Sequence, residues 1–196
     1  MKITESDIFA IPKVFRLYDH HWEIKSYINE ELPSGEFAEF GVGSGASINK
    51  FATLYPKKTI HGFDSFKGLS EAWRDLPAGA FAQEGLPPVN SNVKLWVGYF
   101  AETLPGFIQH LDHNNTKIKF LHVDCDLEYS TNEIFDSLNN YIVPGTFILF
   151  DEIYNGHDEE YNQELRAFNR WLENYNREVK LLFRSDWQQM FCEVTK

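Results

Sequence analysis

Short apolar runs alternate along the chain with longer segments whose apolar residues recur every three or four positions. The runs predict strands at 36–40, 59–63, 93–97, 118–123 and 146–150, and the periodic segments predict helices at 46–55, 103–111, 129–138 and 160–175. Two final runs, at 179–183 and 189–194, are separated by Ser185-Asp186 and predict a hairpin. This order indicates an α/β fold with a seven-stranded, mostly parallel sheet, an antiparallel C-terminal hairpin and helices on both faces.

Two segments depart from this alternation. Residues from about Pro12 to Leu32 have mostly helical spacing, so we predict an N-terminal helical segment at 1–35 that acts as a lid on the substrate side. A ligand-binding domain would then occupy residues 36–196. Residues 67–92 are rich in glycine and proline and predict a long loop, a type of segment that often covers a substrate.

Composition narrows the class of protein. A chain of 196 residues suits a single domain, and a hydrophobic content of 43% excludes general disorder. The net charge of −11, without a basic cluster, argues against nucleic acid or an anionic membrane as partner. Only two cysteines occur and no apolar segment reaches the roughly 18 residues that span a bilayer, so we expect a cytoplasmic protein without a disulfide framework.

Acidic residues follow or end the predicted parallel strands. In open α/β sheets, ligands bind beyond the carboxyl ends of the strands, so acids placed there are expected to share one site. The acids concerned are Glu39, Asp64, Asp124 with Asp126, and Asp151 with Glu152.

A glycine-rich turn joins the strand at 36–40 to the next helix. Gly41, Gly43 and Gly45 have the spacing G-x-G-x-G, which differs from the dinucleotide fingerprint G-x-G-x-x-G. Glu39 would repel a pyrophosphate but suits a cationic ligand, and Asp64 ends the next strand, where a ribose-binding acid belongs. S-adenosylmethionine has a ribose and a sulfonium but no phosphate, so it fits better than NAD. A purely structural turn, with Asp64 exposed, is the alternative.

Five segments resemble, in the same order, the macrocin O-methyltransferase group of class I methyltransferases. They are E-F-G-V-G-S-G at 39–45, G-F-D-S-F-K-G-L at 62–69, V-G-Y-F with T-L-P at 97–105, F-L-H-V-D-C-D-L at 120–127, and V-P-G followed by F-D-E at 143–152. The resemblance implies a Rossmann-like class I methyltransferase fold. It identifies residues 36–196 as a methyltransferase domain that binds S-adenosylmethionine.

The resemblance also implies a reaction and its residues. A methyl group would pass to a hydroxyl of a small sugar-bearing or secondary metabolite, with Mg²⁺ or another divalent cation assisting. The implied cofactor-binding residues are Asp64 at the ribose, Ser65 and Phe66 near the adenosine, and Glu39, Gly41, Gly43, Gly45, Gly98 and Asp124 around them. Asp124, Asp151 and Glu152 would bind the metal. The implied catalytic residues are Asp124 and Asp126, with Asp126 as the general base. Two residues depart from the pattern, since Glu152 replaces an aspartate found in many relatives and Glu128 replaces a tyrosine.

Elementary chemistry supports this assignment without deciding it. Hard cations prefer oxygen ligands, and alternate residues of a strand share a face, so Asp124 and Asp126 would divide one site between metal and base or compete for it. The acids could instead cap helices, as Asp126 lies just before one. His122 is either a core histidine or a minor candidate near the adenosyl group. Trp73-Arg74 could contact an acceptor or pack on the core.

Two other functions stay open at this stage: an NAD-linked or nucleotide-sugar oxidoreductase on a similar fold, and a non-catalytic cofactor-binding domain. The expected partner is a small hydroxylated acceptor. The aromatic residues Phe15, Tyr18 and Trp22 make a homodimer possible.

Overall fold

The computed structural model of the chain describes residues 1–14, 20–28, 35–154 and 162–196. Within these ranges one eight-stranded sheet has the order β1-β7-β8-β6-β5-β2-β3-β4, and only β8 runs antiparallel to its neighbours. The strands are β1 (Lys13–Val14), β2 (Glu36–Phe40), β3 (Ile60–Asp64), β4 (Val93–Val97), β5 (Ile118–Val123), β6 (Phe147–Phe150), β7 (Val179–Ser185) and β8 (Met190–Val194).

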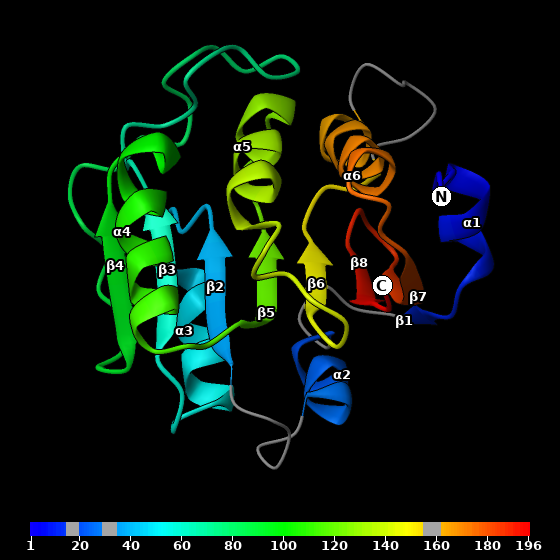
Figure 1. Ribbon diagram of the computed structural model, residues 1–196. Helices are drawn as coiled ribbons and strands as arrows, with labels where there is room; N and C mark the ends of the chain where they lie inside the picture. The colour runs from blue at the N-terminus through cyan, green and yellow to red at the C-terminus, as the bar shows by residue number, and fades with distance from the viewer. Residues whose placement is uncertain (15–19, 29–34, 155–161) are drawn as a thin grey trace.

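Helices cover both faces of the sheet. As Figure 1 shows, α4, α5 and α6 lie in front of the sheet and α3 lies behind it, with α2 near the lower ends of the strands. The helices are α1 (Glu5–Ala10), α2 (His20–Tyr27), α3 (Ala46–Leu54), α4 (Phe100–His113), α5 (Glu128–Leu138) and α6 (Gln163–Asn174). The predicted three-layer arrangement with a C-terminal antiparallel hairpin is confirmed.

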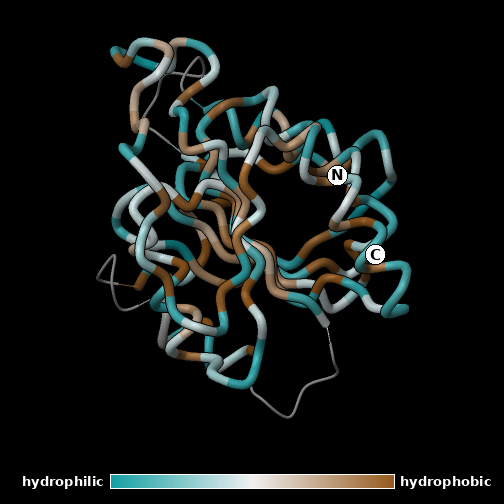
Figure 2. The backbone as a smooth tube through the Cα atoms, turned by 90° about the vertical axis from the view of Figure 1, so that its left-hand side faces the viewer, coloured by the Kyte–Doolittle hydropathy of each residue, from teal (hydrophilic) through white to brown (hydrophobic). Residues whose placement is uncertain are grey.

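Strand β6 is apolar along its whole length because both faces of the sheet are buried, each against a separate hydrophobic core. In β6, Ile148 and Phe150 belong to the core under α4, α5 and α6, while Phe147 and Leu149 belong to the core under α2 and α3. All four side chains are buried. Figure 2 shows the same result for the molecule, with hydrophobic chain in the centre and mostly hydrophilic chain outside.

The N-terminal region differs from the prediction in two ways. Lys13–Val14 adds an eighth strand by parallel pairing with β7, so the predicted number of seven is wrong. Two residues are too few to give an alternating pattern, and this strand depends on a partner far along the chain. Helix α1 falls inside the predicted helical segment at 1–35 but before Pro12, where the helical spacing begins; Thr4 and Asp7 form a capping box at its start.

The described part of the N-terminal segment packs against the sheet. Ile8 joins the core under α6, and Ile24 and Ile28 join the core behind the sheet. A lid role for residues 1–35 stays a prediction. The side chains of Phe15, Tyr18 and Trp22, on which the dimer prediction relied, lie outside the described residues. Among the described helices, none combines the length and apolar character required of a membrane span.

Candidate functional site

A cavity of about 680 Å³ runs along the carboxyl edge of the sheet. It joins the glycine turn after β2 to the acids that follow β5 and β6. Six acidic residues line it, against one lysine, Lys50, so the cavity suits ligands that bring positive charge. The six are Asp64, Asp124, Asp126, Glu133, Asp151 and Glu152.

The glycine turn lies directly against the end of β5. A Cβ on Gly41 would lie 1.6 Å from the backbone oxygen of Asp124, and Gly41 has a φ of +95°. Only glycine permits this approach with this backbone conformation. Asp124 N also donates to Phe40 O at 2.9 Å, so the turn and the first acid of the Asp-x-Asp segment are fixed to each other.

Asp64 closes the glycine turn from the neighbouring strand. Its Oδ2 accepts hydrogen bonds from Val42 N at 2.9 Å and Gly43 N at 2.8 Å, and its Oδ1 accepts one from Phe66 N at 2.7 Å. The sequence analysis placed this carboxylate at the ribose, and it does line the cavity. Since an ionised carboxylate accepts about four hydrogen bonds, Asp64 can hold the turn and still receive a ligand hydroxyl.

Glu39 is fully buried beneath the cavity and does not line it. Its Oε1 accepts a hydrogen bond from Ser47 Oγ at 2.8 Å, and its Oε2 lies 3.0 Å from Nδ1 of His122. Both partners line the cavity, so Glu39 acts on a ligand through them. As a carboxylate only accepts hydrogen bonds, it selects the His122 tautomer that carries hydrogen on Nδ1.

Asp126 has a strained backbone. Its φ is +62°, and Leu127 N donates to Cys125 O at 2.6 Å across it, which makes Asp126 the centre of a classical γ-turn. Such strain is concentrated at functional sites. The capping alternative is not supported, because the N-cap of α5 is Leu127 and the N–H of Glu128 donates to Oε1 of Gln163 at 2.9 Å rather than to Asp126.

Buried acids crowd around Asp126. Burial, followed by its interaction with Asp126, raises the pKa of Glu152 to about 12. Burial also raises the pKa of Asp126, while Glu152 and the nearby Arg74 act in the opposite direction. For Asp124, burial and then the charges of Asp151 and Glu39 raise the pKa well above its usual value. Carboxylates that repel one another in this way form a site that a cation would stabilise.

The described residues also group a ring nitrogen of His122 with carboxylate oxygens of Asp124 and Asp151, all within 4.8 Å of one another. Gln189 orients this group by donating from Nε2 to Asp151 Oδ1 at 2.8 Å, and Ser185 Oγ in turn donates to Gln189 Oε1 at 2.6 Å. The donor set of one imidazole and two carboxylates fits a divalent cation.

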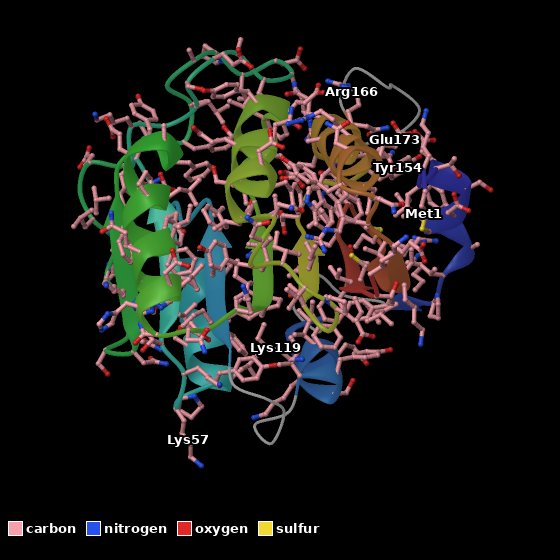
Figure 3. All side chains as sticks on the ribbon, in the orientation of Figure 1. Met1, Lys57, Lys119, Tyr154, Arg166 and Glu173 are labelled. Carbon is pink, nitrogen blue, oxygen red and sulfur yellow. The ribbon has the colours of Figure 1, made fainter. Side chains whose placement is uncertain are left out.

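Glu164, in the first turn of α6, ties the two acidic segments together. It is fully buried, its Oε1 accepts a hydrogen bond from Cys125 N at 3.4 Å, and its Oε2 accepts one from Glu152 N at 3.2 Å. Arg166 in the same turn pairs with Glu128 at 2.7 Å; Figure 3 labels Arg166 at the start of α6. The relative position of the two segments therefore depends on α6.

Most residues predicted for the site come together. Those that line the cavity are Gly41, Gly43, Asp64, Ser65, Gly98, Asp124, Asp126, Asp151 and Glu152. Glu39, Gly45 and Phe66 lie behind the lining and support the turn. The structure groups His122 rather than Glu152 with Asp124 and Asp151, and it adds Lys50, Glu164 and Gln189, which the sequence analysis did not single out.

The loop at 67–92 closes one side of the cavity through Phe81 and Gln83. Trp73 is buried, and the Arg74 guanidinium lies 3.8 Å from the centre of its ring. Trp73 therefore packs on the protein, while Arg74 donates to Oε1 of Gln188 at 3.5 Å and its charge lowers the pKa of Asp126.

A second group of possible metal ligands, Glu36, His61 and His110, includes the first residue of β2, at the end of that strand away from the cavity. Trp96 Nε1 donates to His61 Nδ1 at 3.1 Å, so a neutral His61 carries its hydrogen on Nε2, 3.2 Å from Glu36. That nitrogen then has no lone pair for a cation, and Trp96, His61 and Glu36 form a chain of hydrogen bonds instead of a metal site.

Comparison with solved structures places this fold among methyltransferases. The calicheamicin methyltransferase CalS11 matches with a TM-score of 0.71 and 21% identity, over 91% of this chain and 80% of that one. The O-methyltransferase NovP matches with a TM-score of 0.62 and 18% identity, over 92% and 80% of the two chains. Human N-acetylserotonin methyltransferase, solved with S-adenosylmethionine, gives 0.54 and 11%, over 90% and 51%. These likenesses confirm the predicted Rossmann-like class I fold.

Comparison of sequences identifies the family. No curated protein matches the chain in sequence. A family model described as a methyltransferase domain matches residues 38–153, which is more than half of the chain and includes the glycine turn and both acidic segments. The match confirms the resemblance inferred from the motifs. The chain belongs to this methyltransferase-domain family.

Proposed function

We propose that the protein transfers the methyl group of S-adenosylmethionine to a hydroxyl group of a small molecule, assisted by a divalent cation. The observation that carries this proposal is the single cavity of about 680 Å³ that joins the glycine turn to the acids after β5 and β6. A cofactor at the turn and an acceptor at the acids would then meet in one continuous cavity. Methyl transfer requires such alignment above all, because the donor is already activated.

The cofactor end of the cavity would hold S-adenosylmethionine. Asp64 would accept hydrogen bonds from the ribose hydroxyls, with Ser65 and Gly98 beside the adenosine and Gly41 and Gly43 allowing close backbone contact. Glu39, through Ser47 and His122, adds negative charge below the turn, which favours the cationic sulfonium over a pyrophosphate.

The acidic end would bind the acceptor. Asp126 would accept the proton of the acceptor hydroxyl on a carboxylate oxygen, which requires its ionised form. Burial raises the pKa of Asp126, which makes its carboxylate a stronger base, while Glu152 and Arg74 limit that rise. Asp124 and Asp151 would hold the cation, with Glu152 as the further predicted ligand. When bound, the cation would lower the pKa of the acceptor hydroxyl.

We propose a sugar hydroxyl or a similar alcohol as the acceptor. CalS11, which shares the fold, is described as a TDP-rhamnose 3'-O-methyltransferase. A small polar acceptor agrees with a cavity that six acidic residues line. The proposal involves no nucleic-acid or membrane partner. Residues 1–35 would contribute to the acceptor end of the cavity.

The test is a methyl-transfer assay with radiolabelled S-adenosylmethionine and a panel of sugars, nucleotide sugars and phenols, with Mg²⁺ or with a chelator. Cation-dependent transfer of label to a hydroxyl supports the proposal. A chain that binds S-adenosylmethionine but labels no acceptor in either condition would favour a non-catalytic binding domain.

A further inference from the structure

His122 has one ring nitrogen engaged and one without a partner. Nδ1 lies 3.0 Å from Glu39 Oε2, in a pair of side chains that are each no more than 2% exposed. Nε2 is buried and has no hydrogen-bond partner among the described residues. An unsatisfied buried polar atom has a free-energy cost, so its persistence needs an explanation.

The surroundings of His122 supply a chemical explanation. The ring lies within ligand distance of Asp124 and Asp151, and it lines the cavity. Since Glu39 holds the hydrogen on Nδ1, Nε2 carries the lone pair that a metal requires. A histidine that binds a metal through one ring nitrogen usually donates the N–H of its other ring nitrogen to a carboxylate. The carboxylate fixes the tautomer and increases the basicity of the ring.

The strand geometry favours the same arrangement. His122 and Asp124 are alternate residues at the end of β5, so they share one side of the sheet. Val123 pairs with Phe150 of β6, which brings Asp151 next to Asp124. Gln189 occupies Oδ1 of Asp151, which leaves Oδ2 for a cation.

We infer that His122 is a metal ligand through Nε2, together with Asp124 and Asp151, and that the site therefore prefers a transition-metal ion to Mg²⁺. The inference rests on the proposed cation-assisted function. Imidazole nitrogen suits transition metals, whereas Mg²⁺ prefers oxygen ligands alone. Glu39 is the residue that positions the ring.

Mn²⁺ bound to the full-length protein, without S-adenosylmethionine, tests the inference by electron spin-echo envelope modulation. A coordinated imidazole gives ¹⁴N modulation, and labelling the protein with ¹⁵N-histidine should abolish it. This measurement needs no variant, so a folding defect cannot obscure it. Bound Mn²⁺ without histidine nitrogen coupling, or no Mn²⁺ binding at all, would overturn the inference.

Variants add a second readout through calorimetric Mn²⁺ titration. His122→Gln should lose the modulation and weaken Mn²⁺ binding by about 10- to 100-fold, in the range seen when the surroundings of a metal are altered. His113→Gln, an exposed histidine at the end of α4, is the matched control and should leave both unchanged. Unaltered Mn²⁺ affinity in His122→Gln would refute the assignment. S-adenosylmethionine binding, measured separately without metal, tests the proposed function and distinguishes the two failures.

Discussion

Replacing Gly41 by alanine should separate the end of β2 from the end of β5. The new Cβ would lie 1.6 Å from Asp124 O and 2.6 Å from Asp124 C, both backbone atoms that no side-chain rotation can move. A left-handed conformation costs a non-glycine residue about 1–2 kcal/mol, and overpacking adds about 1–3 kcal/mol. The free energy of unfolding should therefore fall by about 2–5 kcal/mol.

Gly43→Ala provides the matched control in the same turn. Its φ is +50°, but a Cβ there would meet no atom within 4 Å, so only the backbone cost of about 1–2 kcal/mol applies. For a chain of this size 1 kcal/mol lowers Tm by roughly 2–4 °C. Thermal unfolding followed by circular dichroism should show a loss of roughly 5–20 °C for Gly41→Ala and roughly 2–8 °C for Gly43→Ala. Equal Tm values for the two variants would refute the assigned contact between the glycine turn and Asp124.

Three further predictions concern the acids. Asp126→Asn should lower kcat by about 10²- to 10⁴-fold, because the general base is lost. The calorimetric Kd for S-adenosylmethionine should change by less than about twofold. A normal kcat would exclude Asp126 as the base. Glu164→Gln should weaken Mn²⁺ binding about tenfold and speed amide exchange at Cys125 or Glu152 in NMR. Glu173→Gln, at the exposed end of α6 in Figure 3, should change neither. Slow exchange retained at both amides would contradict the role of Glu164 in joining the two acidic segments. The hydrogen bond from His61 lowers the pKa of Glu36, so its stabilising effect is present above the usual carboxyl pKa and is lost as the pH falls below it. The stability difference between wild type and Glu36→Gln in urea should therefore shrink in acid, and a difference that grows on acidification would reverse the sign of this argument.

The sequence was informative where a local pattern determines structure. The glycine turn, the apolar strands and the acids at strand ends are all local signals, and parallel pairing brings them to one edge of the sheet. His122 carried a usable signal too, since it precedes Asp124 by two positions in a strand and thus shares its face.

Other parts of the site depend on contacts between distant segments. Glu164 lies 39 positions from Cys125, inside a helix whose pattern is that of any amphipathic helix. Gln189 reaches Asp151 from the hairpin, 38 positions away. No periodicity reveals which polar residue will meet a backbone N–H or a carboxylate after folding. The short strand β1 escaped prediction for the same reason, because it forms by pairing with β7, far along the chain.

The central claim is that the cavity binds S-adenosylmethionine at the glycine turn. Calorimetric titration of the full-length protein with S-adenosylmethionine, and in parallel with NAD, tests it most directly. The structure predicts one S-adenosylmethionine per chain and no heat with NAD, because Glu39 and the acids lining the cavity disfavour a pyrophosphate. Binding of NAD with no binding of S-adenosylmethionine would contradict the account.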